Sequence, residues 1–343
     1  MLSPWDDYLI HQTADPIDMV ENDDPRWFDR LYFGIHDRDG KFLLVTGLGN
    51  YPNTGVMDGY VAAVHNQVQH NLRLSRKPAG ERGNTQLGPL FFKIIEPHKR
   101  WALELGENPS GILFSLEYRN RPVPYMVRKV VYPPRGEQPT GFSHFFQPGR
   151  FSGSVSIGDS KFVGDFPGSR DRSWGVRAAV ERMGIHFWIQ VQFSSFCISL
   201  YYSEDRNHNV TYLDGAVFPD GGAPVPIVDL RHKVSFDRGD REHTGAELIV
   251  VDSKGQEFRL HSRQLSRGIY LQGAGYGGWH GQDRGQYHVE HEEWDTGQPD
   301  FFKSLGFPMY DQLAEFEYKE EKSTGIFEAG FSRSPAFQYK AHL

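Results

Sequence analysis

One short stretch of the chain concentrates groups that could do chemistry: residues 168–177 are Gly-Ser-Arg-Asp-Arg-Ser-Trp-Gly-Val-Arg. A carboxylate paired with guanidinium groups has a depressed pKa, whereas burial against an aromatic ring raises the pKa and keeps a proton on the acid. Asp171 is therefore either a general acid or part of a structural clamp with Arg170, Arg172 and Arg177. The acid hypothesis requires that the arginines point away. If they clamp Asp171, the proton must come from elsewhere.

Three further side chains could hold or move a proton. Tyr60 follows an expected turn at residues 57–59, where a phenol could donate to a carbonyl at a cavity mouth; the alternative is a half-buried tyrosine with its hydroxyl in water. His186 is either a catalyst or a hydrogen-bonded strand histidine. Asp58 either belongs to the site or bonds its own backbone in the turn. We therefore name Asp171, Tyr60 and His186 as candidate catalytic residues.

A dense group of metal-ligand types lies near the C-terminal end, at His280, His288, Glu290, His291 and Glu292. In a strand, His288, Glu290 and Glu292 share one face while His291 lies on the other. No three-ligand set results, and the chain has no His-Glu-x-x-His motif. We predict no bound metal here.

The sequence contains none of the motifs that we sought for nucleophilic catalysis or nucleotide binding. Ser173 has no evident neighbouring base, and no Gly-x-Ser-x-Gly element occurs. The glycine cluster at 273–279 lacks phosphate-loop spacing, and we expect a bulged or closely packed strand end there. Rossmann and kinase signatures are also missing, so the predicted activity needs no cofactor.

The elements that must position these groups are antiparallel strands. The chain has 37 glycines and 21 prolines, too many for long helices. Alternating segments separated by turn residues predict hairpins. These are residues 35–45, 154–163 with a turn at 158–159, 248–260 with a turn at 253–255, and 316–331 with a turn at 323–325. Short helices are expected at most at 25–30 and 301–305.

Two expected strands carry a polar face opposite an apolar one. In 185–193 the polar face holds His186, Trp188, Gln190 and Gln192, and the other face is predicted to be core. In 64–74 the polar face holds His65, Gln67, Gln69, Asn71 and Arg73. These faces meet either bulk water or a ligand cavity, and their scarcity of Lys and Glu favours the cavity. Candidate substrate-binding residues are Trp174, Trp188, Asp58, His65 and Gln190.

Composition narrows the class of protein. The 343 residues carry a net charge of −7, which offers no basic stripe for nucleic acid. Cys197 is the single cysteine and is expected to be a small core residue in a reducing compartment. No leader or membrane-spanning run is evident, so we expect a cytoplasmic protein without stable membrane insertion, and a homodimer is possible. The 14% aromatic content suggests that any pocket is large and apolar.

The domain organisation is harder to place. Proline-rich stretches at 121–124 and 132–139 are expected to be loops. We place the division near Asp165, which gives domains at 1–165 and 166–343.

Five stretches together resemble a known family. The chain resembles an uncharacterised bacterial branch of the lipocalin-like superfamily, which includes carotenoid 1,2-hydratases (hydroxyneurosporene synthases), tocopherol-cyclase-like proteins and AttH-like proteins. The matching stretches are residues 36–40, 47–53, 57–60, 147–153 and 170–177. In hydratase-like members an Asp-x-x-Trp-Gly element resembles 171–175 here. This chain has Arg172 where those members often carry His, so the resemblance alone does not assign a mechanism.

The resemblance implies an all-β fold of two consecutive lipocalin-like (calycin-type) domains, with a hydrophobic cavity near their interface. It also implies acid-base hydration, cyclisation or isomerisation of an isoprenoid, steroid-like or polyketide-like molecule. Two alternatives remain open: a noncatalytic carrier of an apolar metabolite, and a purely structural role for the 168–177 stretch as an interdomain hinge. An enzyme requires an ionisable group that projects into the cavity, whereas a carrier does not.

Overall fold

The structure is a computed structural model, and it is almost entirely β-sheet. It describes residues 6, 9, 11–78, 83–135, 138–177, 183–237, 241–298, 301–334 and 336–343. Strands make up 62% of it, and its helices include the short 3-10 turns η2 (Pro52–Thr54) and η3 (Phe301–Ser304). No helix in these ranges combines the length and apolarity needed to cross a membrane. The all-β expectation is confirmed.

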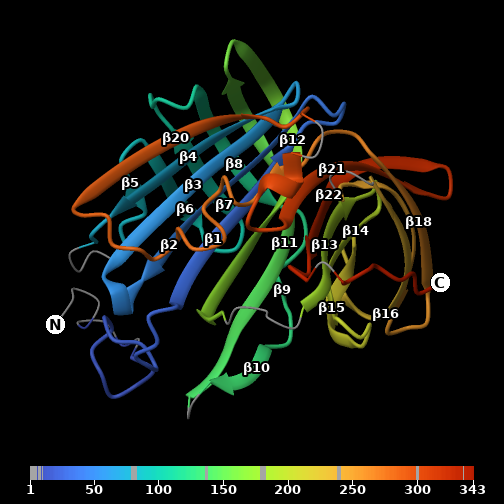
Figure 1. The fold of residues 1–343 in the computed structure, drawn as a ribbon, viewed down its shortest axis with the longest axis horizontal. Coiled ribbons are helices and arrows are strands. Elements are labelled where there is room, and N and C mark those ends of the chain that lie inside the picture. Colours follow the sequence, from blue (N-terminus) through green and yellow to red (C-terminus); the bar gives the residue numbers. More distant parts are fainter. Residues whose placement is uncertain are drawn as a thin grey trace.

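The first domain is an open, curled sheet of 13 strands (Figure 1). In spatial order its strands are β20 (Tyr287–Asp295), β4 (Val68–Arg76), β3 (Val56–His65), β2 (Phe42–Tyr51), β1 (Trp27–His36), β12 (Ser160–Val176), β11 (Gln138–Ile157), β8 (Ile112–Asn120), β7 (Arg100–Leu105), β6 (Leu90–Glu96) and β5 (Gln86–Leu87), with β9 (Tyr125–Met126) and β10 (Val130–Arg135) paired to β11.

The second domain is a closed barrel of eight strands, on the right of Figure 1. Its order is β18 (Glu257–Gln264), β17 (His243–Asp252), β16 (Val225–Phe236), β15 (Val210–Pro219), β14 (Phe196–Asp205), β13 (Met183–Gln192), β22 (Glu321–Phe331) and β21 (Met309–Tyr318), and the short β19 (Ile269–Tyr270) pairs with β21. Pairing of β18 with β21 closes the barrel. The two domains match the expected pair of lipocalin-like barrels.

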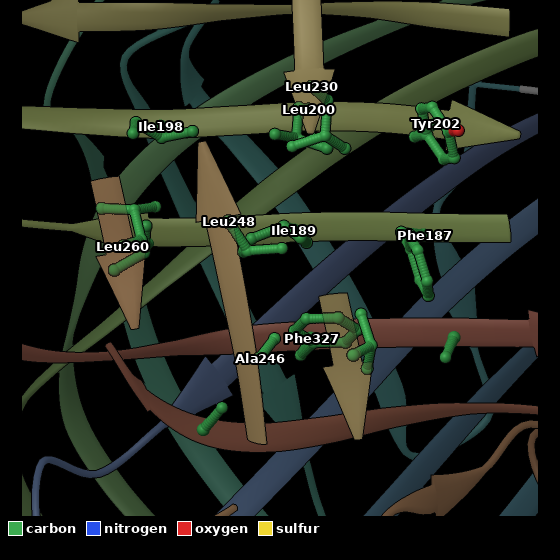
Figure 2. Close-up of a cluster of buried hydrophobic side chains, with 14 of the residues drawn as sticks. Phe187, Ile189, Ile198, Leu200, Tyr202, Leu230, Ala246, Leu248, Leu260 and Phe327 are labelled. Carbon is green, nitrogen blue, oxygen red and sulfur yellow. The ribbon is translucent and has the colours of Figure 1, made fainter. Parts of the chain in front are cut away.

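Strand alternation explains how the barrel obtains its core. The predicted apolar face of 185–193 points into the barrel, where Ile185, Phe187 and Ile189 are fully buried. Neighbouring strands contribute equivalent positions, so the barrel is filled by side chains and not hollow. Figure 2 shows part of this cluster, including Phe187, Ile189, Ile198, Leu200, Tyr202, Leu230, Ala246, Leu248, Leu260 and Phe327.

The outer wall of the barrel packs on the first sheet. Trp188, which alternates with the core residues of β13, belongs to a third buried cluster together with Tyr32 and Phe146 of the first sheet. The Tyr32 and Trp188 rings meet edge to face with centroids 5.0 Å apart. The first sheet therefore covers and buries the polar face of β13.

One strand of the first sheet comes from the second half of the sequence. After the barrel strands β13 to β18, the chain returns to the first domain, where β20 pairs with β4 along its whole length (Figure 1). The boundary predicted at Asp165 lies within β12, whereas sheet membership changes between β12 and β13. As a division into independently folding units, the boundary stays a prediction.

Several local predictions are confirmed. The hairpins at 35–45, 154–163 and 248–260 form with the expected turns. The helical signal at 301–305 corresponds to η3. Cys197 is buried, and burial raises the pKa of its thiol to about 12, as suits an inert core residue.

Other local predictions are wrong. Residues 64–74 form two strands, because Asn66 and Gln67 adopt positive φ and make a tight turn between β3 and β4. The last hairpin turns at Lys319, not at 323–325. The helix expected at 25–30 gives way to β1, which starts at Trp27. The loop expected at 132–139 is largely the β10–β11 hairpin, with 136–137 outside the described residues.

Candidate active site between the domains

A cavity of about 60 Å³ lies between the first sheet and the outer wall of the barrel. This volume holds a few water molecules, so a larger ligand enters only when lining side chains move. The lining is rich in ionisable groups, which corrects the expectation of a large apolar pocket. These groups are Arg30, Asp58, His144, Asp171, Arg177, His186, His280 and Glu328.

Asp171 faces this cavity, and two of the three nearby arginines do not. Alternation along β12 sends Asp171 and Ser173 to the cavity and Arg170 and Arg172 to the opposite face. Arg170 lies over aromatic rings of the first domain, with its guanidinium 5.1 Å from the Phe145 centroid. Arg172 forms an ion pair with Asp29 of β1. Arg170 and Arg172 thus point away from Asp171, which meets the requirement of the acid hypothesis for two of the three arginines.

The third arginine and the tryptophan of the stretch take different places. Arg177 lines the cavity, and its guanidinium lies 4.5 Å from the Phe142 ring centroid. Trp174 shares the face of Arg172, outside the cavity, and is half-buried. Of the predicted substrate-binding pair Trp174 and Trp188, only Trp188 lines the cavity.

Asp171 has a histidine partner that sequence reasoning did not identify. His144 of β11 places its Nε2 atom 3.0 Å from Oδ2 of Asp171, and both side chains are buried. A carboxylate and an imidazole at this distance can pass a proton between them. Tyr201 of β14 faces the same imidazole from the barrel, with ring centroids 6.3 Å apart. The pair therefore lies in the interdomain layer, with both domains contributing to its surroundings.

A second acidic group comes from the barrel wall. Asp311 of β21 and Glu328 of β22 lie directly opposite one another in the strand register. The Tyr32 hydroxyl of the first domain donates to Oδ2 of Asp311 at 2.8 Å. His186 Nε2 makes a short contact with Oε1 of Glu328. Four proton-carrying side chains thus meet in one buried cluster.

Burial sets the protonation of this cluster. Loss of water raises the pKa of Glu328 to about 7, although Asp311 and Arg177 pull it down. The pKa of Asp311 lies well above its ordinary value because the group is buried and faces the charge of Glu328. Burial lowers the pKa of His186 to about 3. Near neutral pH the carboxyl pair therefore retains a proton, while His186 is a neutral acceptor.

Asp58 and Tyr60 are positioned by β3, and no turn separates them. The turn predicted at 57–59 is wrong, because β3 runs from Val56 to His65. Asp58 accepts a hydrogen bond from the backbone N–H of Gly281 at 2.7 Å and contacts His280 Nδ1 at 3.1 Å. Burial holds the pKa of Tyr60 well above its usual range, so the phenol stays protonated beside the cavity.

The turns at 271–281 cover one side of the cavity and bring Tyr276 and His280 to it. The glycine cluster is thus a series of turns, not the expected strand end. The polar face of β4 holds these turns: Gln69 bonds both backbone groups of Tyr270, and Arg73 donates to the Gly273 carbonyl at 2.8 Å. Gln69, Asn71 and Arg73 on that face are buried beneath these turns, so they contact neither bulk water nor the cavity, and the expectation that they line it is wrong.

Arg30 supplies positive charge on the same side of the cavity. Its Nε donates to the Tyr51 hydroxyl at 2.7 Å, and its guanidinium lies 5.7 Å from the Tyr276 centroid. An arginine held between aromatic rings keeps its charge and presents donors to an oxygen of a ligand.

Two predicted substrate-binding residues lie elsewhere. His65 bonds the Lys41 carbonyl at 2.7 Å and Ser160 Oγ at 3.1 Å, away from the cavity. Gln190 accepts from Ser199 Oγ at 2.5 Å and lines a separate cavity of about 10 Å³.

The fold separates the histidines and glutamates that are clustered at 280–292 in the sequence. His280 reaches the cavity, whereas Glu290 and Glu292 form ion pairs with Arg73. His288 contacts Glu290 at 3.1 Å. The group therefore supports the cavity wall through Arg73.

Sequence reasoning missed Glu328 and Asp311, although a signal existed. Glu328 is the single charged residue in the otherwise uncharged stretch 326–331. Asp311 is likewise the single charged residue in 309–314. Alternation places both acids opposite core residues, as it places His186. A lone acid between apolar neighbours in a strand is the pattern that would have found them.

Comparison with solved structures shows a shared fold. A candidate AttH protein (NE1406) from Nitrosomonas europaea matches with a TM-score of 0.60 at 9% identity, covering 95% of this chain and 99% of that one. Kievitone hydratase from Nectria haematococca matches with a TM-score of 0.57 at 11% identity, covering 88% and 89%. CghA with Sch210972 gives a TM-score of 0.54 at 10% identity, covering 90% and 89%. The expected likeness in fold to AttH-like and hydratase proteins is confirmed.

Sequence comparison reaches a narrower group. No curated protein matches the chain. One family model, described as a family of unknown function (DUF8625), matches residues 2–331. This match covers most of the length, and the chain therefore belongs to the DUF8625 family.

Proposed function

We propose that this protein is a cofactor-independent enzyme that transfers a proton to a small organic molecule in the interdomain cavity. The observation that carries the proposal is the cluster of Glu328, Asp311 and His186 beside the cavity, in which Glu328 has a pKa raised to about 7 by burial. A general acid works best when its pKa lies near the working pH. A carrier has no need to keep such a carboxyl group protonated.

The roles of the lining residues are assigned by their positions. Glu328 donates its proton to a carbon of a substrate double bond, so a C–H bond forms and the π electrons leave the other carbon positive. Trp188 lies beside Glu328 in the strand register, and its ring can shield that charge. A water or an internal hydroxyl then attacks and loses its proton to the Asp171–His144 pair, 3.0 Å apart. Proton return through the buried cluster restores Glu328.

Hydration, cyclisation and isomerisation share the first protonation and differ only in the fate of the cation. Water attack gives hydration, attack by an internal hydroxyl or second double bond gives cyclisation, and proton loss from a neighbouring carbon gives isomerisation. The likeness in fold to a protein named kievitone hydratase supports hydration first.

The substrate class that we propose is an isoprenoid, steroid-like or polyketide-like molecule that carries at least one oxygen. Aromatic side chains such as Trp188 offer contact to its carbon skeleton. Arg30 and the protonated Tyr60 offer donors to a carbonyl or hydroxyl oxygen. An apolar molecule without oxygen would leave these buried donors unsatisfied, at a cost of about 1–3 kcal/mol for each group.

The first experiment is native mass spectrometry with organic extraction of freshly purified wild type, Glu328→Gln and Glu320→Gln. Glu320 is an exposed residue at the turn between the same two strands and serves as the matched control. A molecule bound by all three and altered by wild type and Glu320→Gln, but not by Glu328→Gln, supports the enzyme. An unaltered molecule in all three identifies a carrier.

A second measurement does not need the substrate. Carbon-13 NMR of glutamate side chains, assigned with Glu328→Gln, should show one carboxyl group that titrates near neutral pH. A Glu328 carboxyl that titrates near its ordinary 4.5 would contradict the proposed acid.

A further inference from the structure

A second cluster of ionisable residues lies in the barrel, away from the interdomain cavity. Along β14, Tyr201 faces the cavity, whereas Tyr202 belongs to the barrel core. Glu204 follows in the same alternation, so its side chain lies on the barrel side and is fully buried. His232 of β16 is also fully buried beside it. Two partly exposed histidines, His208 and His342, complete the cluster.

The distances resemble a set of metal ligands. His232 Nε2 lies 3.2 Å from Oε1 of Glu204, and His342 Nε2 lies 3.1 Å from the same oxygen. His208 Nδ1 lies 3.4 Å from the other carboxylate oxygen. Ligand atoms held 2.0–2.1 Å from a tetrahedral zinc ion are separated by about 3.3 Å. The ligand atoms of Glu204, His232 and His342 all lie within 4.8 Å of one another.

Several atoms of the cluster lack a hydrogen bond, although Oε1 of Glu204 accepts one from the Tyr202 hydroxyl at 2.6 Å. Among the residues that the structure describes, Oε2 of Glu204, Nδ1 of His208 and Nε2 of His232 and of His342 are buried without a hydrogen bond. Buried polar atoms are normally paired, and each exception calls for an explanation. The ligand atoms of Glu204, His232 and His342 converge, with His208 beside the second carboxylate oxygen, and a cation among them would explain the missing hydrogen bonds.

A neighbouring tyrosine orients one of the imidazoles. The Tyr339 oxygen lies 2.8 Å from His232 Nδ1, accepts the backbone N–H of Val234 at 2.9 Å, and lies 3.3 Å from the His232 carbonyl. All three contacts are satisfied when Nδ1–H and the Val234 N–H donate to the tyrosine oxygen and its hydroxyl donates to the carbonyl. Nε2 then presents its lone pair to the cluster, as a metal ligand must.

The residues of this cluster come from segments that are far apart in the sequence. His232 and His342 exchange backbone hydrogen bonds of 2.9 and 2.8 Å, which place the last described residues beside β16. His208 lies in the turn after β14, four residues beyond Glu204. Ligands from β14, β16 and the C-terminal segment would therefore be joined at one point, with His208 of the turn beside them.

Protonation also suits metal binding. Burial lowers the pKa of His232 despite the nearby carboxylate, which keeps the imidazole neutral. Burial by itself raises the pKa of Glu204, but contacts with His232, Tyr202 and His342 lower it on balance. Neutral histidine and ionised glutamate are the forms that bind a metal.

We propose that Glu204, His232 and His342 bind one divalent transition-metal ion, with Zn²⁺ as the best fit to two imidazoles and a carboxylate. These three residues hold the ion, and the neighbouring His208 or a water molecule completes a tetrahedral site. The ion ties the C-terminal segment to the end of the barrel. This site is separate from the interdomain cavity and takes no part in the proposed proton transfer.

The test uses the full chain, purified without a metal-affinity step and treated with a chelator. Co²⁺, and separately Zn²⁺, are titrated into wild type, His342→Ala and the control His291→Ala. His291 is exposed on β20, outside the cluster. We expect wild type and His291→Ala to take up one ion per chain with the visible absorption of tetrahedral Co²⁺. The metal affinity of His342→Ala should fall at least about 100-fold. Mutation of a residue that only supports a ligand usually costs about 10–100-fold, and removal of a ligand itself should cost more.

Thermal unfolding supplies an independent readout. Zn²⁺ should raise the melting temperature of wild type and of His291→Ala, because an ion that binds only the folded state stabilises it. The rise should be absent in His342→Ala. Tyr339→Phe, which leaves the ligands in place, should weaken binding by about 10–100-fold.

Two results would overturn the proposal. One is chelator-treated wild type that takes up no Co²⁺ or Zn²⁺ at micromolar concentrations, which would mean that protons alone occupy the cluster. The other is equal uptake by His342→Ala and wild type, which would place the bound ion elsewhere. Circular dichroism verifies that each variant is folded before titration.

Discussion

The interior of the barrel and the cavity on its outer wall are built from the same strands, yet they have opposite chemistry. In β13 and β22, Phe187 and Phe327 point inward to a filled apolar core, whereas His186 and Glu328 point outward to a buried polar cluster. The inner face loses water when the barrel closes, but the outer face loses water only when the first domain docks. One alternating pattern thus provides both a stable core and a group with a strongly shifted pKa.

The largest effect is expected where the outer face does chemistry. Glu328→Gln keeps the shape of the side chain but removes its transferable proton. We expect turnover of the extracted substrate to fall by about 10²- to 10⁴-fold, the usual contribution of a general acid. Turnover within a factor of about two of wild type would remove Glu328 from the mechanism.

The inner face of the same strand should instead show a large effect on stability. Phe327 is fully buried and stacks on His243 with centroids 4.3 Å apart. Phe327→Ala should lower the free energy of unfolding by about 3–5 kcal/mol, measured by urea denaturation. A loss below about 1 kcal/mol would show that the barrel collapses around the missing ring.

The pH dependence of stability distinguishes the outer face of the barrel strands from the inner face, because only the outer face carries Glu328. Glu328 ionises near 4.5 when unfolded and near 7 when folded, so between these values the folded protein binds more protons. Its contribution to stability therefore falls as pH rises through this window. The free energy of unfolding of wild type, relative to Glu328→Gln, should fall by about 3 kcal/mol from about pH 4 to about pH 8.

Chemical denaturation of both proteins at several pH values tests this difference. Burial lowers the pKa of His186 to about 3, which acts in the opposite sense, but the comparison between variants cancels most of that contribution. A difference that does not change with pH would mean that Glu328 has the same pKa in the folded and unfolded protein.

The smallest effect is expected at His65, which was predicted to bind substrate but lies at the far end of β3 from the cavity. His65→Ala should leave turnover within about twofold of wild type. Loss of the hydrogen bonds to Lys41, Ser160 and Asn66 at a half-buried site should lower the free energy of unfolding by about 1–2 kcal/mol. A tenfold loss of turnover without loss of stability would extend the site toward this residue.

Local pattern predicted much of the fold, and its failures have physical causes. The alternation in 64–74 concealed a turn because Asn66 and Gln67, neither of them glycine, adopt positive φ and connect two strands without interrupting the polar and apolar order. Gly325 was taken as a turn residue. It is instead a packing glycine, because a Cβ there would lie 2.2 Å from the Gln190 carbonyl oxygen of the neighbouring strand.

Some residues of the candidate site could be named from the sequence, whereas others were found only in the structure. Asp171, Tyr60, His186, Asp58 and Trp188 were named from sequence and line the cavity. Their partners, such as His144 and Asp311, come from distant strands that no motif connects to them. Local spacing carries no information about which distant strands will meet.

By itself, the sequence determined the all-β fold, the hairpins and which side chains of each strand share a face, because alternation along a strand is a local property of the backbone. Only the tertiary structure decided which of those faces would lose water. Docking of the open sheet against the closed barrel buried Glu328 beside Asp311 and His186, and that burial shifts their pKa values. The chemistry proposed for this protein therefore arises from the contact between its two domains.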